Sequence, residues 1–383
     1  MKIVYLLPEG LSNPAGMERV TTIKANYLAD ECNYDISIVT TEQMGRPVYY
    51  PLSEKIHLHH LNIGIYKNFG RESYPRKIIS RFLKTKEYKK ALEKLLLKIE
   101  PDITISTLGI DIDFLSELKD KSIKIGELHF PGNFRELMAK KLHKGFIPNY
   151  IAKLRTSSLI QKCGKLSQLI VLTEEEKTLW SKTDNITVIP NPLPFYPKEN
   201  STLNNKAAIA VGRLSYEKGF DLLIQVWEII HRKYPDWILN IYGKGEEKNN
   251  LTKLIKEKKL EKVVIINDPH PEIQSQYLKH SFSIFPTRYL DSFGMVIIEA
   301  MSCGLPVIAF DAPCGPKDII TEGINGFLVK TEDIHSMANK ILTLIEFEDM
   351  RKSMGKKAKE MAEKYKAEKI MLQWINLFHE LKK

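Results

Sequence analysis

The sequence has few cysteines and no long apolar run. Only four cysteines occur in 383 residues, Cys32, Cys163, Cys303 and Cys314, and no two of them form a CxxC pair. This spacing argues against a disulfide framework and a cysteine-bound metal, and it predicts a reducing compartment such as the cytoplasm. No uncharged apolar stretch reaches the roughly 18 residues of a membrane-spanning helix. The composition thus excludes a disulfide-rich secreted protein and a protein held by membrane-spanning helices.

The sequence also lacks a dinucleotide-binding fingerprint. No GxGxxG follows any apolar segment of strand length, and the first glycine loop reads Asn13-Pro-Ala-Gly-Met-Glu18 instead. A NAD-dependent oxidoreductase, which needs such a loop, therefore receives little support. A hydrophobic content of 43% and a charged content of 27% are those of a soluble globular protein. A chain of 383 residues predicts two domains of about 150–200 residues each.

The positive charge is concentrated in one segment. Residues 71–165 hold 21 Lys and Arg against 11 Asp and Glu, which equals the net charge of the whole chain, +10. Residues 75–99 and 135–165 combine these basic side chains with apolar helical faces, a pattern typical of contact with an anionic membrane surface. A nucleic-acid or heparin binder is an alternative. The segment lacks the regular aromatic residues of a stacking platform, so no nucleic-acid partner is expected.

Apolar segments of strand length alternate with helical patterns along most of the chain. This alternation predicts α/β architecture with two doubly wound, Rossmann-like parallel sheets. A proline-rich turn and a polar stretch over residues 190–205 separate the two halves. We predict an N-terminal domain over 1–190, a second domain over 191–365, and a C-terminal helix over 366–383 that packs back on the first domain. The predicted strands are 3–7, 36–40, 56–61, 103–106, 123–128, 169–172, 186–189, 207–211, 237–242, 263–266, 282–285 and 307–310.

The first half offers two candidate positions for ligand contact. Gly16 lies in a turn-rich loop between the strand at 3–7 and a helix at 17–30, an arrangement that binds phosphates in doubly wound folds. His129 follows the strand at 123–128, and ligands in these folds bind at the carboxyl ends of parallel strands. A histidine there can change its protonation near neutral pH, and the alternative is a structural residue packed against its neighbour.

The second half carries two cations in a corresponding loop. Arg213 and Lys218 lie between the strand at 207–211 and a helix at 220–233. Two cations near a helix N-terminus suit a pyrophosphate, because Arg is a planar fork and Lys a point charge. Surface charges explain many such pairs, but this position favours anion binding.

A second anion site is predicted around a helix that begins near residues 293–295. Asp291 and Gly294 precede this helix, and Glu299 lies one turn into it. Glycine lets a backbone come close to a ligand, and the unpaired N–H groups of a helix start attract negative charge. The pattern suits a phosphate with sugar hydroxyls on either side.

Two segments of the second half resemble a known family. They read Val211-Gly-Arg-Leu-Ser-Tyr-Glu-Lys-Gly-Phe-Asp221 and Arg288-Tyr-Leu-Asp-Ser-Phe-Gly-Met-Val-Ile-Ile-Glu-Ala-Met-Ser-Cys-Gly-Leu-Pro-Val-Ile-Ala309. Both are similar to the retaining glycosyltransferases of family four, which have the GT-B fold. The resemblance covers essentially the whole chain and is more specific in the second half. Residues 313–320 are similar to a subset that builds bacterial capsule, exopolysaccharide or lipopolysaccharide.

The resemblance implies a fold and roles for individual residues. The two Rossmann-like domains would face each other across a cleft and hold one substrate each. Arg213 and Lys218 match the pair that holds the donor diphosphate. Asp291 and His129 match residues near the transferred sugar, and Glu299 matches the acid that takes the ribose hydroxyls. The other matched donor positions are Gly16, Gly212, Gly243, Ser292, Phe293, Gly294 and Met295.

Two positions depart from the family's usual pattern. The first acid is usually Glu and here is Asp291, one methylene shorter, and Leu290 lengthens the loop before it. The N-terminal glycine pair of the family is reduced to Ala15-Gly16. The change at Asp291 leaves the donor sugar open.

We therefore expect a retaining, metal-independent hexosyltransferase. It would move a sugar from a nucleotide diphosphate sugar, with UDP as the expected nucleotide, to a hydroxyl of a growing lipid-linked surface glycan. No metal and no other cofactor is expected, because Arg and Lys neutralise the diphosphate. The protein would be cytoplasmic and peripheral at the inner face of the plasma membrane. The alternatives are a nucleotide-sugar epimerase of the same fold and a basic polyanion-binding protein without catalysis.

Overall fold

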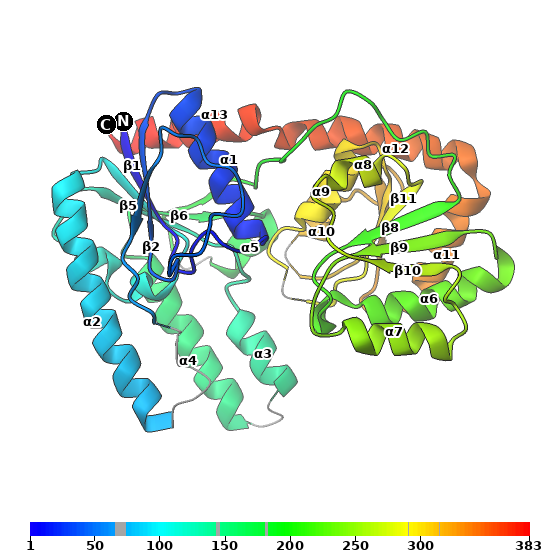
Figure 1. The fold of residues 1–383 in the computed structure, drawn as a ribbon, viewed down its shortest axis with the longest axis horizontal. Helices are drawn as coiled ribbons and strands as arrows, with labels where there is room; N and C mark the ends of the chain where they lie inside the picture. Colours follow the sequence, from blue (N-terminus) through cyan, green and yellow to red (C-terminus); the bar gives the residue numbers. More distant parts are fainter. Residues whose placement is uncertain (66–73, 143–145, 181–182, 290, 314) are drawn as a thin grey trace. The chain divides into compact units, whose positions relative to one another are not determined.

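The chain divides into two compact units (Figure 1). The computed structural model describes residues 1–65, 74–142, 146–180, 183–289, 291–313 and 315–383. Unit 1 comprises Met1–Pro194 and Ala367–Lys383, and unit 2 comprises Phe195–Lys366. Leu290, which was expected to lengthen its loop, and Cys314 lie outside the described residues.

Unit 1 is built on a seven-stranded parallel sheet in the order β3-β2-β1-β4-β5-β6-β7. Its strands are β1 (Lys2–Leu6), β2 (Asp35–Thr40), β3 (His57–His60), β4 (Ile103–Ser106), β5 (Ile123–Glu127), β6 (Gln168–Val171) and β7 (Ile186–Val188). Its helices are α1 (Gly16–Asp30), α2 (Tyr74–Ile99), α3 (Phe134–Leu142), α4 (Phe146–Cys163), α5 (Glu174–Leu179) and α13 (Ala367–Leu381), with 3-10 turns at Ile110–Asp113 and Leu115–Glu117. The strand order reverses between β1 and β4, and ligands bind at such a switch point in doubly wound sheets.

The inner strands of unit 1 are buried along their length. β1 and β4 carry almost only apolar or small residues, as expected where helices cover both faces of a parallel sheet. The two ends of the chain complete this unit together, since α13 contacts α1. Asp102 links them as well: its carboxylate accepts from the backbone N–H of Lys2 at 2.7 Å and from Lys382 Nζ at 2.8 Å.

Unit 2 is built on a six-stranded parallel sheet in the order β10-β9-β8-β11-β12-β13. Its strands are β8 (Ala207–Val211), β9 (Ile238–Tyr242), β10 (Val264–Asn267), β11 (Phe282–Phe285), β12 (Val307–Phe310) and β13 (Gly326–Val329). Its helices are α6 (Phe220–Lys233), α7 (Lys248–Glu257), α8 (Ile273–Tyr277), α9 (Met295–Ser302), α10 (Pro316–Ile319), α11 (Ile334–Glu346) and α12 (Glu348–Ala362), with 3-10 turns at Tyr216–Lys218 and Glu363–Tyr365. The order reverses between β8 and β11, so the loops after these strands border the switch point.

The core of unit 2 lies between its sheet and the helices α6 and α11. Trp227 and Ile230 of α6 are fully buried, and α6 contacts α11. Trp237 stacks on Phe282 with ring centroids 5.4 Å apart. The apolar residues of α6 recur at helical spacing, which explains why its predicted bounds match the observed ones.

Most predicted strands are confirmed, four of them with the same bounds: 103–106, 207–211, 282–285 and 307–310. β13 has no counterpart among the predicted strands. Its apolar part is only three residues long, from Phe327 to Val329. Such a short run between a glycine and a lysine lacks the pattern of a strand and forms one through its pairing with β12.

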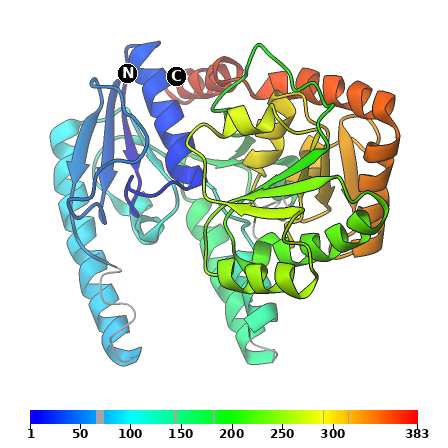
Figure 2. The same cartoon turned by 45° about the vertical axis from the view of Figure 1, so that its right-hand side comes forward.

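The apolar side chains of α2 lie in two environments. Leu92 and Leu96 are buried in the core of unit 1, whereas four apolar side chains nearer the start of α2 are exposed. They are Ile78, Ile79, Phe82 and Leu83. The N-terminal part of α2 extends beyond the sheet of unit 1 in both views (Figures 1 and 2), so no core lies against it. No helix in the described part of the chain is long and apolar enough to cross a membrane.

Asp111 is a buried acid at the carboxyl end of β4. Its Oδ2 accepts a hydrogen bond from the Ser106 hydroxyl, and Ser106 Oγ accepts from the backbone N–H of Leu108 at 2.9 Å. Its Oδ1 has no hydrogen-bond partner among the described residues. Burial raises the pKa of Asp111 to about 6, although the hydrogen bond from Ser106 partly opposes this effect. Asp111 therefore keeps its proton to a higher pH than an Asp in water does.

This pKa predicts a pH dependence of stability. The folded protein binds the proton of Asp111 more tightly than the unfolded chain does, because the pKa of Asp111 is 3.8 in the unfolded chain. The free energy of unfolding should therefore fall as the pH rises from about 4 to about 6. D111N cannot ionise, so its free energy of unfolding should not show this fall, which is on the order of 3 kcal/mol in the wild type. Urea unfolding at several pH values measures this difference. D113N is the control, since Asp113 is partly exposed and pairs with Lys162 at 2.7 Å. A difference between D111N and wild type that stays constant with pH would contradict the prediction.

Candidate functional site

The loop after β8 in unit 2 is shaped by close backbone contacts. Gly212 and Gly243 follow the adjacent strands β8 and β9. A Cβ at Gly243 would lie 1.9 Å from the carbonyl oxygen of Gly212, so only glycine fits there. Gly219, with φ of 69°, precedes α6, and a Cβ there would lie 2.0 Å from the oxygen of Pro286. These contacts bring the N-terminus of α6 against the loop after β11.

The two predicted cations lie in this loop and differ in their surroundings. Lys218 Nζ lies 2.5 Å from Asp291 Oδ2, and both side chains are 18% exposed. Arg213 Nη2 lies 2.8 Å from Glu217 Oε1, and its side chain is 66% exposed. Glu217 also accepts a hydrogen bond from Ser215 Oγ at 2.6 Å, which fixes its position. Lys218 is thus held between two loops, while Arg213 extends into solvent from one.

We call residues 212–219, which carry Arg213 and Lys218, the cation loop. Asp291 joins the cation loop to the start of α9. Its Oδ1 accepts a hydrogen bond from the backbone N–H of Gly294 at 3.1 Å, while its Oδ2 contacts Lys218. Gly294 has φ of 83° and immediately precedes α9. The short Asp side chain therefore bridges a lysine and a helix N-terminus. Among the predicted donor residues, Lys218, Asp291 and Gly294 are the group in direct contact.

The other predicted residues in and just before α9 are buried or half-buried. Phe293 is buried and packs edge-on against Tyr365 with ring centroids 5.6 Å apart. Glu299 is buried in the second turn of α9, Met295 is half-buried at its start, and Ser292 is half-buried just before it. The N-terminus of α9 thus carries one polar side chain inward and leaves Ser292 and Met295 near the surface.

Arg288 anchors the cation loop and had no predicted role. Its guanidinium makes two contacts of 2.7 Å with the carboxylate of Asp221 and one of 2.8 Å with Glu332. It also donates to the carbonyl of Tyr216 at 2.8 Å, and its backbone N–H donates to that of Glu217. The guanidinium carbon lies 4.3 Å from the centre of the Tyr216 ring. Arg288 is therefore the residue that ties residues 216–217 to the loop after β11.

In unit 1, Gly16 is the first residue of α1. It is exposed, and a Cβ at this position would meet no atom within 4 Å. Its φ is not positive, so neither packing nor backbone conformation requires glycine here. Ala15 precedes it and makes no side-chain cap. The first turn of this 15-residue helix carries one acid, Glu18, which is buried, so the position of Gly16 is open while the turn itself already holds a carboxylate.

His129 lies two residues beyond β5, and its side chain is 6% exposed. Its Nε2 is 3.2 Å from Glu127 Oε1. Glu127 in turn contacts Lys24 of α1. The turn after His129 is fixed by Glu176, whose Oε1 accepts from the backbone N–H of Gly132 at 2.8 Å and from Trp180 Nε1 at 2.7 Å.

Four residues around the candidate site were missed: Lys24, Glu127, Glu217 and Arg288. Two signals were available. Glu127 is two positions from His129 across a strand end, and Lys24 is a charge among the apolar positions of its helix. Within the described ranges, no group of three or more His, Cys, Asp or Glu residues could hold a metal ion.

Replacing Arg288 by Lys should loosen the cation loop. A lysine cannot make the bidentate contact with Asp221 and the contact with Glu332 together. We therefore expect the free energy of unfolding to fall by about 2 kcal/mol. Urea unfolding and hydrogen exchange of the amides at 216–218 would measure it. The control is R232K, because Arg232 is 74% exposed and makes a surface contact with Glu228. Equal stability and exchange in R288K and R232K would disprove the anchoring role.

Comparisons with known proteins agree with this fold. Residues 195–361 match the family described as glycosyl transferases group 1. A glycosyltransferase of amylovoran biosynthesis from Erwinia amylovora is 27% identical over 98% of this chain and 99% of its own length. The crystal structure of a TarM variant from S. aureus, in complex with Fondaparinux, alpha-GlcNAc-glycerol and UDP, has a TM-score of 0.78 at 20% identity. It covers 98% of this chain and 99% of its own, and it supports the GT-B fold.

An uncharacterised glycosyltransferase of Haemophilus influenzae is 31% identical over 98% of this chain and 99% of its own length. Its similarity runs through both units, whereas the family model matches unit 2. The chain belongs to the glycosyl transferases of group 1.

Proposed function

We propose that the chain is a retaining hexosyltransferase that acts without a metal. It moves a sugar from a nucleotide diphosphate sugar, with UDP as the nucleotide, to a hydroxyl of a growing lipid-linked surface glycan. Unit 2 takes the donor and unit 1 the acceptor. The observation that carries this proposal is the group formed by Lys218, Asp291 and Gly294 at the switch point of unit 2. The amylovoran relative and the UDP in the TarM structure support the substrate classes.

The donor diphosphate would bind beside the loop that carries Arg213 and Lys218. Lys218 would exchange its contact with Asp291 for one with a phosphate oxygen, and Arg213 has the freedom to reach the same group. The N–H groups at the start of α9 add positive potential, as helix N-termini do for phosphates. Gly212 and Gly243 keep the adjoining backbone free of side chains. Glu299 would accept from ribose hydroxyls, and Asp291, once released, from a sugar hydroxyl.

The chemistry needs little beyond these charges. The bond between the anomeric carbon and the diphosphate oxygen breaks, and the acceptor oxygen bonds to the same face of that carbon. The acceptor proton passes to the departing phosphate, so the products are a glycoside and UDP. Lys218 and Arg213 stabilise the negative charge that develops on the leaving group. His129 would lie beside the transferred sugar and contact its hydroxyls.

Two alternatives are set aside. The two relatives described above are named as glycosyltransferases, which favours transfer over epimerisation. A polyanion binder without catalysis does not account for the geometry of a lysine, an acid and a helix start at the switch point.

Lys218 gives the direct test of the donor site. A screen of nucleotide sugars for thermal stabilisation would first identify the donor, because a ligand that binds the folded state raises its stability. K218A should then lower kcat/KM for transfer by roughly 10²–10³-fold, since one stabilising charge is lost. K258A is the matched control: Lys258 contacts Glu228 at 2.5 Å and is similarly buried in unit 2. Near-normal transfer by K218A would contradict the assignment, and EDTA should leave the wild type active.

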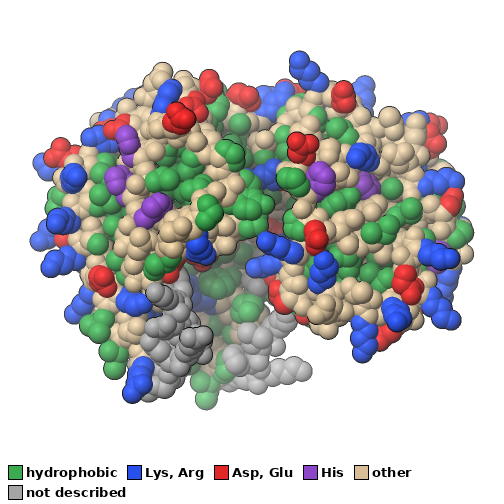
Figure 3. All heavy atoms as spheres, in the orientation of Figure 1, with side chains coloured by type: hydrophobic (Ala, Val, Ile, Leu, Met, Phe, Trp, Pro, Cys, Tyr) green, Lys and Arg blue, Asp and Glu red, His purple; other side chains and the backbone are tan. Residues whose placement is uncertain are grey.

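We also propose that unit 1 is peripheral at the inner, anionic face of the plasma membrane. The starts of α2 and α4 each expose a stripe of apolar side chains at helical spacing, 44–70% exposed. The residues on α2 are Ile78, Ile79, Phe82 and Leu83, and those on α4 are Ile147, Tyr150, Ile151 and Leu154. Figure 3 displays hydrophobic and basic side chains next to each other at the edge of unit 1 that carries α2. Apolar stripes flanked by basic residues suit insertion among anionic headgroups.

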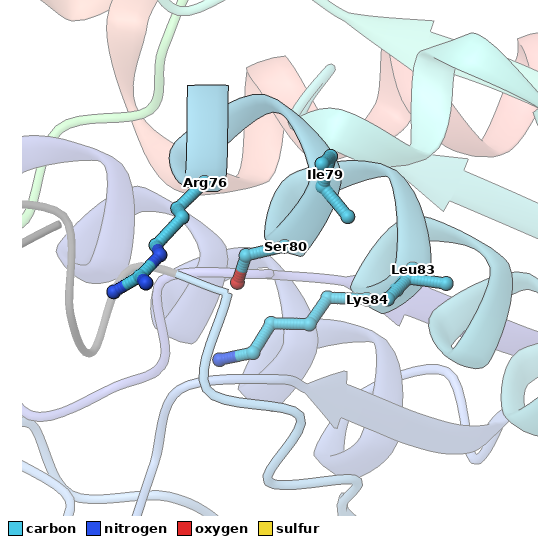
Figure 4. Close-up of a pocket in the computed structure, with 5 residues that line it drawn as sticks. All are labelled: Arg76, Ile79, Ser80, Leu83 and Lys84. Carbon is cyan, nitrogen blue, oxygen red and sulfur yellow. The ribbon is translucent and has the colours of Figure 1, made fainter. Parts of the chain in front are cut away.

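Basic side chains flank these stripes. Arg76, Ile79, Ser80, Leu83 and Lys84 line a shallow cavity of about 350 Å³ on α2, with Arg76 and Lys84 directed to one side of the helix (Figure 4). Lys84 donates to the carbonyl of Gly64, and Lys89 pairs with Glu117 at 2.6 Å, so both are engaged within unit 1. Among the described side chains, the exposed basic residues are Arg76, Arg81, Lys86, Lys90, Lys94 and Lys98 on α2 and Lys153 and Arg155 on α4. Their charge complements an anionic lipid surface.

Serine substitutions should release the protein from such a surface. F82S/L83S removes two exposed apolar side chains and should weaken binding to phosphatidylglycerol-containing vesicles by roughly tenfold or more. The control is I324S/M350S, which removes two comparably exposed apolar side chains of unit 2. Vesicle sedimentation at several salt concentrations measures both variants. Equal binding of the two variants, or binding to nucleic acid in place of vesicles, would refute the membrane surface.

A further inference from the structure

A buried pair of opposite charges lies next to His129 in unit 1. Lys24 of α1 contacts both carboxylate oxygens of Glu127, the last residue of β5, and each side chain is 1% exposed. Glu127 Oε1 lies 3.2 Å from Nε2 of His129. Burial by itself raises the pKa of Glu127, but the nearby Lys24 and His129 outweigh it and lower the pKa to about 2. The carboxylate is therefore ionised at neutral pH.

Aromatic rings from two further elements enclose the lysine. Lys24 Nζ lies 4.5 Å from the centre of the Trp374 ring on α13 and 5.6 Å from that of the Tyr5 ring on β1. Both aromatic side chains are buried. A cation over a ring face is attracted by the ring electrons, and the attraction grows when water is excluded. The lysine is thus held by α1, β1, β5 and α13 at once.

Stability alone does not account for this pair. Removing two charges from water costs about as much as their attraction returns, and an apolar pair of similar volume is often as stable or more stable. A buried charge pair that touches a candidate active-site residue has another use: a carboxylate that contacts one ring nitrogen fixes the orientation of an imidazole and the nitrogen that carries its proton. Glu127 is placed to do this for His129.

We propose that Glu127 is a positioning residue for His129, and that Lys24, enclosed by Trp374 of the C-terminal helix, holds Glu127 in place. The charge of Glu127, with Oε1 3.2 Å from Nε2, favours the tautomer that carries its proton on Nε2 and one orientation of the ring. The inference rests on the proposed function, in which His129 lies beside the transferred sugar. It adds three residues of unit 1, one of them on α13, to those on which transfer depends.

Two variants of the pair separate positioning from stability. E127Q keeps the shape of the side chain and removes its charge, and K24M/E127M replaces the pair by apolar side chains that preserve the packing. If Glu127 positions His129, both variants lose kcat by roughly tenfold or more. The donor KM should change by less than about threefold, because the diphosphate contacts lie in unit 2. E127D, which keeps the charge one methylene further back, should recover part of the activity lost in E127Q.

The same strand supplies the matched control. Lys124, near the start of β5, pairs with Asp120 at 2.7 Å, and the two side chains are 10% and 2% exposed. D120N and K124M/D120M therefore disturb a buried pair of the same type at the opposite end of β5 from Glu127. These variants should alter the melting temperature but leave kcat within about twofold of wild type. If K24M/E127M folds and keeps wild-type kcat, or if the control pair lowers kcat equally, the positioning role is overturned.

A spectroscopic readout makes the test independent of transfer. Proton–nitrogen correlation spectra of the ring of His129 identify the protonated nitrogen without any donor present. E127Q should change the pattern of ring cross-peaks of His129 from that of the wild type. D120N should leave this pattern unchanged. A changed pattern in E127Q together with a wild type that transfers no sugar would support the positioning role and reject the proposed function. An unchanged pattern in E127Q, with transfer abolished in H129A, would reject the positioning role and leave the proposed function standing.

Discussion

The contact between Lys218 and Asp291 is the interaction on which the rest of unit 2's candidate site depends. It joins the loop after β8 to the loop after β11, which are neighbouring strands at the switch point. The same acid binds the N–H of Gly294, so a single carboxylate couples a cation to a helix start. In the proposed function, a phosphate oxygen would take the place of Asp291 beside Lys218, so binding of the donor would be tied to the release of a hydrogen-bond acceptor.

Both units use buried charge to hold a residue at a strand end. In unit 2, Arg288 reaches from the loop after β11 to Asp221 and to backbone carbonyls of the cation loop. In unit 1, Lys24 and Glu127 lie beneath His129. Loops at the carboxyl ends of strands have few apolar contacts of their own, so charged hydrogen bonds to the rigid sheet and helices replace packing there.

The sequence was sufficient to predict every strand except β13 and the loops at the switch points. Buried runs of apolar residues with only Ser or Thr between them mark β4, β8, β11 and β12, because a strand covered on both faces carries little else. What it could not supply was the partner of each charge. Lys218 meets an acid 73 residues away, and Lys24 meets one 103 residues away, and no local pattern encodes such a distance. The sequence also could not show that Phe82 is exposed while Leu92 is buried. Both residues belong to the apolar pattern of the same helix, and only the extent of the sheet distinguishes them.

The return of the C-terminal helix to the first unit has a consequence for how the chain is made. Unit 2 is formed by one continuous stretch, Phe195–Lys366, and can close its core as soon as that stretch has left the ribosome. Unit 1 begins earlier but lacks α13, and thus Trp374 over Lys24, until residues 367–383 have been synthesised. The unit that is synthesised first is therefore completed last. During that interval its face under α13 remains open, and a chain that terminates early would leave a buried lysine and its acid exposed to water while the second unit is already folded.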